Sequence, residues 1–388
     1  MNDNCEIDRR LTRSHELFAA PRMDPAMMAA ASSMTPEQAQ AMMEALSPEE
    51  RAAVEAKQQQ MRQGMLDLGH LVTQLKPSEA EPDAEVSMHK VMLALASAPA
   101  MAQLGTDENA LLGSTKTHEE ARALLSKVED KLEELGAFPV DALNDLPPLQ
   151  WRNTVLLYWH LYKQADEAWL ESEKASLEEE VDHWRGGANQ IGTKLLIQAQ
   201  MLFPQQRWVQ PTLAIARTSA LIANALWSHT AAGSLAKMGR ILEEDGLPMP
   251  KLSIKATVKP RDATEGTVEI TAGLHVQCRI ELTREHAAAA GEGTRPPCNN
   301  PQGIYEAYWL YLEGLKPEGT PNSLILAKPL VVTDLEAKVV TGEAVFQAPP
   351  KPGTYTLRAH ITSTSVIGVE LQCDVCFVVV EDDVPDLE

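Results

Sequence analysis

The feature that most constrains the fold is a change of hydrophobic period near Pro248. From about residue 86 to that point, apolar residues recur at three- and four-residue steps, which is the spacing of amphipathic helices. Beyond it, apolar and polar residues alternate, as in Leu252–Val258, Leu274–Leu282 and Val369–Val379. Alternation at every second residue is typical of half-buried antiparallel strands. The sequence therefore predicts a helical region followed by a β region.

About seven strands are expected in the β region. The remaining strands are predicted at Tyr355–Ile361 and near residues 305–312, 324–332 and 339–347, with turn residues between strands at Gly266, Gly314, Gly342 and Pro352-Gly353. Strand number and alternation together favour an α+β multidomain fold, in which a helical N-terminal and central region precedes an immunoglobulin/fibronectin-III-like β-sandwich. The Cys…Trp…Cys spacing of antibody domains is absent, so this prediction depends on strand count and alternation alone.

Residues 1–85 are interpreted as a Met/Ala-rich helical extension. Two capping boxes, Thr35-Pro36-Glu37-Gln38 and Ser47-Pro48-Glu49-Glu50, each predict a helix start. Methionines cluster around them, and their ordinary use as core filler is favoured over an adaptable binding surface. They are Met23, Met27, Met28, Met34, Met42 and Met43. A linker is expected at Lys76–Asp83. The predicted divisions are 1–85, a helical domain at 86–248, the sandwich at 249–380 and an acidic tail at 381–388.

Several helices are expected in the central domain. The predicted helices are Thr117–Gly136, Gln150–Tyr162, Asp166–Trp184, Gly192–Met201 and Thr212–Trp227. The second places Val155, Leu156, Trp159 and Tyr162 on one side. The third has a strongly acidic face, which is interpreted as a hydrated surface.

Charge and hydropathy exclude two classes of function. Asp and Glu number 55 against 34 Lys and Arg, a net charge of −21, which repels phosphate backbones and argues against nucleic acid as a partner. The longest apolar stretch, Val91–Leu104, is about 14 residues, shorter than the ~20 that cross a bilayer. The segment Thr212–Trp227 carries Arg217 at its middle. No membrane span and no export signal are predicted, and five cysteines favour a reducing compartment.

No motif for catalysis, cofactor or metal binding is complete, so a non-enzymatic protein is expected. Gly187–Lys194 resembles a phosphate-binding loop, but the final Gly-Lys-Ser/Thr order is missing, and a loop between helices is favoured. Cys373 and Cys376 match C-x-x-C, yet on a strand they would lie on opposite faces, and buried structural cysteines are favoured. The histidines show no zinc-ligand spacing, and no nucleophile elbow occurs.

Several segments, in the right order, resemble the Sec63 homology domain family. They are Arg152–Leu161, Arg207–Leu221 continuing to Trp227, Tyr308–Tyr311, Phe346–Tyr355 and Ser363–Gly368. The resemblance covers roughly residues 86–388. The family module occurs in the endoplasmic-reticulum translocation protein and in spliceosomal helicases of the Brr2 type. The segments Tyr308–Tyr311 and Ser363–Gly368 and the acidic end look more like the translocation protein.

The resemblance implies a scaffold at the cytosolic face of the endoplasmic reticulum membrane, which binds a Sec61-type channel and favours its opening. A Sec62-like subunit would bind the acidic end. The partner-binding residues implied are Glu381, Asp382, Asp383, Asp386 and Glu388. No His-Pro-Asp tripeptide of a J domain is present, so Hsp70 recruitment is not expected. Two alternatives stay open: a cassette that scaffolds or regulates a helicase or ribonucleoprotein complex, and a co-chaperone adaptor.

Overall fold

The structure, a computed structural model, describes most of the chain from residue 47 to residue 381. The ranges outside the description are 1–46, 103, 105–117, 135, 137–142, 144, 163–180, 227–230, 245–248, 262–268, 289–305, 318, 333, 335–336, 365 and 382–388. The described residues fall into two compact units, the first ending at Leu66 and the second beginning at Asp67. The predicted helix start at Thr35 and the methionine cluster lie outside the description.

Helix α4 (Pro48–Leu75) begins at the predicted capping box. The Glu50 amide donates to the Ser47 hydroxyl at 3.3 Å, and the Ser47 amide donates to the Glu50 carboxylate at 2.9 Å. These reciprocal bonds satisfy two backbone donors that a helix start otherwise leaves without partners. They also lower the pKa of Glu50, chiefly through the hydroxyl of Ser47. The predicted helix start at Ser47 is confirmed.

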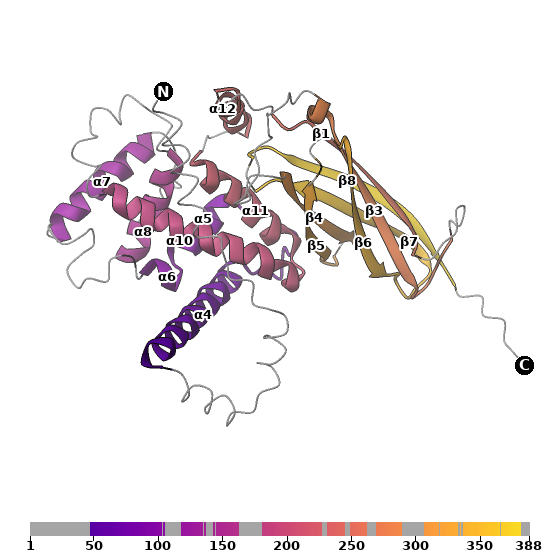
Figure 1. Cartoon of the computed structure of the whole chain (residues 1–388), viewed down its shortest axis with the longest axis horizontal. Coiled ribbons are helices and arrows are strands. Elements are labelled where there is room, and N and C mark those ends of the chain that lie inside the picture. Colours follow the sequence, from indigo (N-terminus) through magenta and orange to yellow (C-terminus); the bar gives the residue numbers. More distant parts are fainter. Residues whose placement is uncertain are drawn as a thin grey trace, which may run out of the picture. The chain divides into compact units, whose positions relative to one another are not determined.

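The helices of the second unit precede its strands in the chain, as Figure 1 shows. They are α5 (Met88–Ala96), α6 (Pro99–Ala102), α7 (His118–Glu134), α8 (Pro148–Tyr162), α10 (Val181–Leu202), the short 3-10 helix η2 (Phe203–Gln206), α11 (Val209–Asn224) and α12 (Ala231–Glu244). A second 3-10 helix, η3 (Glu285–Ala288), lies in the β region. The presence of both helices and sheets confirms an α+β chain.

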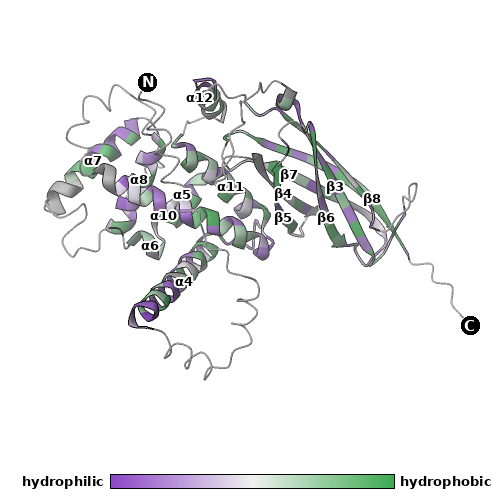
Figure 2. Cartoon of the chain, in the orientation of Figure 1, coloured by the Kyte–Doolittle hydropathy of each residue, from purple (hydrophilic) through white to green (hydrophobic). Residues whose placement is uncertain are grey.

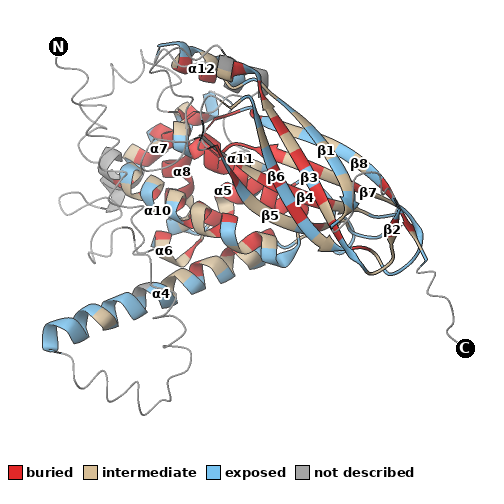
Figure 3. Cartoon of the chain, turned by 45° about the vertical axis from the view of Figure 1, so that its right-hand side comes forward, coloured by how far each residue is buried: buried red, intermediate tan, exposed pale blue. Residues whose placement is uncertain are grey.

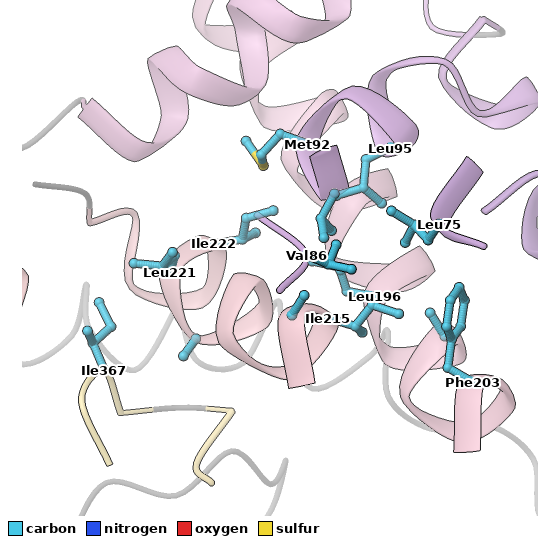
Figure 4. Packing of buried hydrophobic residues seen from close by; sticks show 14 of the residues in the cluster. Leu75, Val86, Met92, Leu95, Leu196, Phe203, Ile215, Leu221, Ile222 and Ile367 are labelled. Atoms are coloured by element: carbon cyan, nitrogen blue, oxygen red, sulfur yellow. The ribbon is translucent and has the colours of Figure 1, made fainter. Parts of the chain in front are cut away.

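Helix α8 is the centre of the helical core. Every residue from Arg152 to Tyr162 is buried, so the expected single apolar face describes only part of it. The helix packs against α5, α7 and α10. Figure 3 shows the buried colour along α8 and its neighbours, and Figure 4 shows side chains such as Met92 of α5, Leu196 of α10 and Ile222 of α11 in the same cluster.

The glycine-rich segment 187–194 is neither a phosphate loop nor a loop between helices, because it lies inside α10. A Cβ at Gly192 would meet Leu157 of α8 at 3.3 Å and Met101 of α6 at 3.5 Å. At Gly187 a Cβ would come within 2.7 Å of the Leu104 side chain. These glycines permit close packing of helices rather than a turn, which corrects the sequence interpretation.

The strands form two sheets whose apolar faces share one core. The strands are β1 (Leu252–Pro260), β2 (Ile270–Thr271), β3 (His275–Arg284), β4 (Glu306–Leu315), β5 (Ser323–Val332), β6 (Val339–Gln347), β7 (Gly353–Thr362) and β8 (Glu370–Val380). Their orders are β1-β3-β6 and β2-β8-β7-β4-β5, and all neighbours are antiparallel except β2 and β8. Figure 2 shows hydropathy alternating along the long strands.

Two predicted turn glycines lie inside strands. Gly314 belongs to β4 and Gly342 to β6. A Cβ at Gly342 would meet Leu310 at 3.2 Å and Leu330 at 3.3 Å, both in the opposite sheet. The missing side chain at Gly342 therefore lets the two sheets approach closely, which a sequence pattern cannot distinguish from a turn.

Candidate interaction site

A polar pocket of about 380 Å³ lies between α11 and the outer face of the five-stranded sheet. Six charged or titratable side chains line it, from four elements and the segment before α5. They are Glu85, Arg217 of α11, Glu313 of β4, Arg358 and His360 of β7, and Glu370 of β8. All belong to the second compact unit. Among these six residues, the two furthest apart in sequence are Glu85 and Glu370, which are 285 positions apart (370 − 85).

Strand register explains why these side chains meet. Glu313 pairs with Arg358 across β4 and β7, and Arg358 pairs with Asp374 across β7 and β8. Directly paired residues of an antiparallel ladder lie on the same face, and residues two apart on one strand do so as well. His360 therefore shares this face with Arg358 and Glu313. The opposite face carries Leu310, Leu357 and Ile361, all buried in the shared core.

Glu313 is the most enclosed acid of the site, with 3% of its surface exposed. Its Oε1 accepts a hydrogen bond from Asn322 Nδ2 at 2.8 Å, and its Oε2 lies 2.8 Å from His360 Nε2. Asn322 is itself held in place, because its Oδ1 accepts from the Lys316 amide at 2.9 Å. A buried carboxylate is tolerated when both oxygens are hydrogen-bonded, so this acid is a structural anchor.

Arg358 and Asp374 form a two-pronged ion pair across β7 and β8. Arg358 Nε donates to one carboxylate oxygen at 2.7 Å and Nη2 to the other at 2.9 Å. This hydrogen bonding lowers the pKa of Asp374 and raises that of Arg358. Two parallel hydrogen bonds to one carboxylate hold the guanidinium group in a single orientation. Arg358 is therefore fixed at the pocket wall.

Arg217 ties three parts of the unit together. Its Nε donates to both Glu370 oxygens at 3.0 Å, and its Nη1 donates to Glu85 Oε1 at 3.0 Å. The backbone N–H of Asn322 also donates to both carboxylate oxygens of Asp83, at 3.1 Å each. The segment before α5, the helix α11 and the five-stranded sheet are thus joined by charged groups.

An apolar contact supports the same junction. Val209, Leu213 and Ala216 of α11 form a separate buried cluster with Tyr311 and Leu324 of the sheet. Trp309 stacks on Tyr311, with ring centroids 5.8 Å apart, and the Leu324 amide donates to the Arg207 carbonyl at 2.9 Å. The hydroxyl of Tyr311 is buried and makes no hydrogen bond within the described structure, and burial raises its pKa.

Outside this pocket, Arg152 is a buried cation deep in the helical core. It is 1% exposed and donates to Asn153 Oδ1 at 2.8 Å and to the Met101 carbonyl at 3.3 Å. Its guanidinium also lies 5.5 Å from the ring centroid of Trp184. Burial lowers the pKa of Arg152 to about 10. These contacts hold α6, α8 and α10 together, so Arg152 is part of the scaffold.

The cysteines differ in burial. Cys278 is buried, Cys373 is half-buried and Cys376 is exposed, so the expectation that both residues of the C-x-x-C pair are buried is wrong. The alternation of β8 places Cys376 on the outer face, where its sulfur hydrogen-bonds the Thr356 hydroxyl at 3.3 Å. Cys5 and Cys298 lie outside the described residues.

The sequence does not predict the pocket between α11 and the five-stranded sheet. Of the predicted partner-binding acids, Glu381 is exposed, and the remaining four lie outside the described residues. Arg217 was visible only as a charge that interrupts an apolar helix. Its acidic partners could not be identified, because Glu85 and Glu370 are brought to it by tertiary packing. Within the described ranges, no group of three or more His, Cys, Asp or Glu side chains is arranged to hold a metal ion, and no helix is long and apolar enough to cross a membrane.

Comparisons with known proteins do not place the chain in a family. No family model and no curated protein match it. Among solved structures, a β-glucosidase from Erythrobacter marinus is 7% identical over 34% of this chain and 16% of the enzyme, with a TM-score of 0.21. A β-glucosidase from Listeria innocua in complex with glucose is 7% identical over the same shares, with a TM-score of 0.19. Similarity at this level supports no conclusion about fold or activity.

Proposed function

We propose that this chain is a non-enzymatic interaction module of the Sec63 type, which binds a protein-translocation channel at the cytosolic face of the endoplasmic reticulum. The observation that carries the proposal is the junction between α11 and the five-stranded sheet. Two of the segments that resemble the family, Arg207–Leu221 and Tyr308–Tyr311, contribute Leu213 and Tyr311 to the two sides of this junction. The resemblance thus concerns residues that set the angle between the helical and β regions.

We also propose that the β region is an immunoglobulin-like sandwich. Support comes from the strand orders β1-β3-β6 and β8-β7-β4-β5, which correspond to the A-B-E and G-F-C-C′ sheets of such domains. A further argument is Tyr355 near the start of β7, whose hydroxyl donates to the Lys351 carbonyl at 2.8 Å. A tyrosine bonded in this way to the preceding corner is a hallmark of immunoglobulin-type domains.

The mechanism we propose is mechanical. A sandwich held at a fixed angle presents its loops to the channel, and binds the open channel more tightly than the closed one. Differential affinity for the two states is the only way in which a bound partner shifts their equilibrium. Arg217 and the apolar cluster that includes Leu213 and Tyr311 resist bending between α11 and the five-stranded sheet. Contact at the loops of the sandwich is therefore transmitted to the helical region.

Affinity capture from gently solubilised cells of the source organism tests the proposal. The bait is the full chain. The test variant is Arg217→Glu, which removes the ion pairs of the junction, and the control variant is Arg240→Glu, an equal charge change at an exposed position of α12. Recovery of Sec61-type and Sec62-like subunits is expected with the unaltered chain and with Arg240→Glu, and reduced recovery with Arg217→Glu. Recovery of splicing or helicase subunits without the channel would refute the proposal.

A further inference from the structure

One stripe along helix α4 follows the spacing of a coiled coil. Its positions are separated by alternating steps of four and three residues, which keep them on the side of the helix that meets a partner helix. They are Val54, Gln58, Met61, Met65, Leu68, Val72 and Leu75. All of them except Gln58 are apolar. The stripe therefore has the pattern of a surface that packs against another helix.

The two ends of the stripe differ in burial. Leu75 is buried in the helical core, and Leu68 and Val72 pack against that core. The methionines that precede them on α4 are open, because Met61 is 49% and Met65 is 74% exposed. Figure 3 shows the exposed colour along this first part of α4. The exposed stripe, defined as Val54, Gln58, Met61 and Met65, continues a packing surface beyond the core that covers its other end.

Charged side chains flank the exposed stripe on both sides. Glu55 and Arg62 lie along one side, and Glu50 and Lys57 lie along the other. Glu55 and Arg62 are exposed, and neither has an ion-pair partner among the residues that the structure describes. From residue 48 to residue 66, three acidic and three basic side chains cancel, whereas the whole chain has a net charge of −21. Two copies can therefore approach each other along this part of α4 without net repulsion between the helices.

We propose that the exposed stripe pairs in the antiparallel direction with the same stripe of a second copy, so that α4 forms a twofold-symmetric dimer. In this register, Val54 of each copy packs on Met65 of the other copy, and Met61 packs on Gln58. Glu55 of each copy lies beside Arg62 of the other, and the twofold axis forms this ion pair twice. The inference does not depend on the channel-binding proposal.

The flanking charges select the antiparallel direction. Charged residues beside the apolar seam of a coiled coil set the orientation of its helices. A parallel pair of α4 helices would place Glu50 beside Glu55 of the second copy, and Lys57 beside Arg62 of the second copy. Both contacts join like charges and oppose association. The antiparallel pair instead joins opposite charges, so the sequence of α4 is complementary to itself in that direction.

Sedimentation velocity of the full chain at increasing concentration tests the proposal, and a monomer–dimer equilibrium is expected. Met65→Glu should raise the dissociation constant of the dimer at least about tenfold, because it places an unpaired charge in the apolar seam. Leu66→Glu is the matched control. Leu66 is 62% exposed and lies about 100° further around the helix, away from the stripe, so the dissociation constant should not change. Circular dichroism checks that both variants fold.

Charge-reversed variants test the direction of the pair. Glu55→Arg and Arg62→Glu should each raise the dissociation constant about three- to tenfold, because each turns two attractive contacts into repulsive ones. The double variant Glu55→Arg/Arg62→Glu restores both ion pairs and should dimerise like the unaltered chain. The two single variants change the net charge in opposite directions, so an equal weakening by both cannot come from net charge.

Three outcomes overturn the proposal. The first is a chain that stays monomeric at every concentration, as expected if residues 1–46 of the same chain or another protein cover the exposed stripe. The second is equal weakening of the dimer by Leu66→Glu and Met65→Glu. The third is tighter association of the two single charge variants, which is the result that a parallel pair of helices predicts.

Discussion

Two tyrosine hydroxyls of the β region have contrasting environments. Tyr311 is fully buried and its hydroxyl has no hydrogen-bond partner in the described structure, whereas the Tyr355 hydroxyl donates to a backbone carbonyl. A buried polar group without a partner is unfavourable by about 1–3 kcal/mol. Tyr311→Phe is therefore expected to leave the free energy of unfolding unchanged or to raise it by up to about 1 kcal/mol.

Tyr355→Phe is the matched control. It removes a made hydrogen bond and should lower the free energy of unfolding by about 1 kcal/mol. Urea titration of both variants followed by tryptophan fluorescence measures the difference. A loss of stability for Tyr311→Phe equal to that for Tyr355→Phe would show that the Tyr311 hydroxyl has a partner, such as a buried water.

A second pair of residues tests how closely the two sheets approach. Gly342→Ala would place a methyl group against Leu310 and Leu330, which are 0% and 4% exposed and have little room to move. Gly314→Ala meets the end of Ile325, which is 38% exposed and free to rotate. We expect Gly342→Ala to destabilise by about 1–2 kcal/mol through overpacking, and Gly314→Ala to change stability by less than about 0.5 kcal/mol. Thermal unfolding of the two variants measures these two changes in stability.

At the scale of elements, the sequence predicts the features that depend on residues close in sequence, but not those that depend on tertiary packing. The capping box at Ser47 and the alternation from Leu252 onward define their elements through neighbours in sequence, and the structure confirms them. Gly187 and Gly192 were misread because their role depends on Leu104 and Leu157, which are distant in sequence. The two-residue β2 has too few residues to show a period.

The ion pair between β7 and β8 makes stability depend on pH. Hydrogen bonding from Arg358 lowers the pKa of Asp374 in the folded chain. A carboxyl group with a lowered folded pKa stabilises the fold above its unfolded pKa of about 3.9, and this contribution is lost as pH falls through the folded pKa. Asp374 is 45% exposed, so the contribution should stay below about 1 kcal/mol.

Asp374→Asn removes the contribution at neutral pH. Its stability should lie below that of the unaltered chain at pH 7 by a few tenths of a kcal/mol. The gap should be smaller at about pH 3, because the stabilisation is lost as pH falls through the folded pKa of Asp374. Urea titrations at the two pH values measure the gap. A difference that persists unchanged at low pH would mean that Asp374 acts through packing instead of charge.

At the scale of the whole second unit, the central question is whether its helical and β regions move as one body. Among the described residues of α11, Arg217 alone forms ion pairs with both Glu85 and Glu370. The carboxylates are 76% and 45% exposed, so each pair is worth at most about 1 kcal/mol. Their combined value therefore lies less in global stability than in holding three elements in one arrangement.

Hydrogen exchange distinguishes these roles. Arg217→Ala should raise amide exchange in residues 83–88 and at the start of β8, because local opening there no longer breaks ion pairs. Exchange in α8, which is buried throughout, should not change. Arg240→Ala, at an exposed position of α12, is the control and should leave exchange in all these segments unchanged. Equal effects of the two substitutions would mean that the apolar cluster that includes Leu213 and Tyr311 alone fixes the junction.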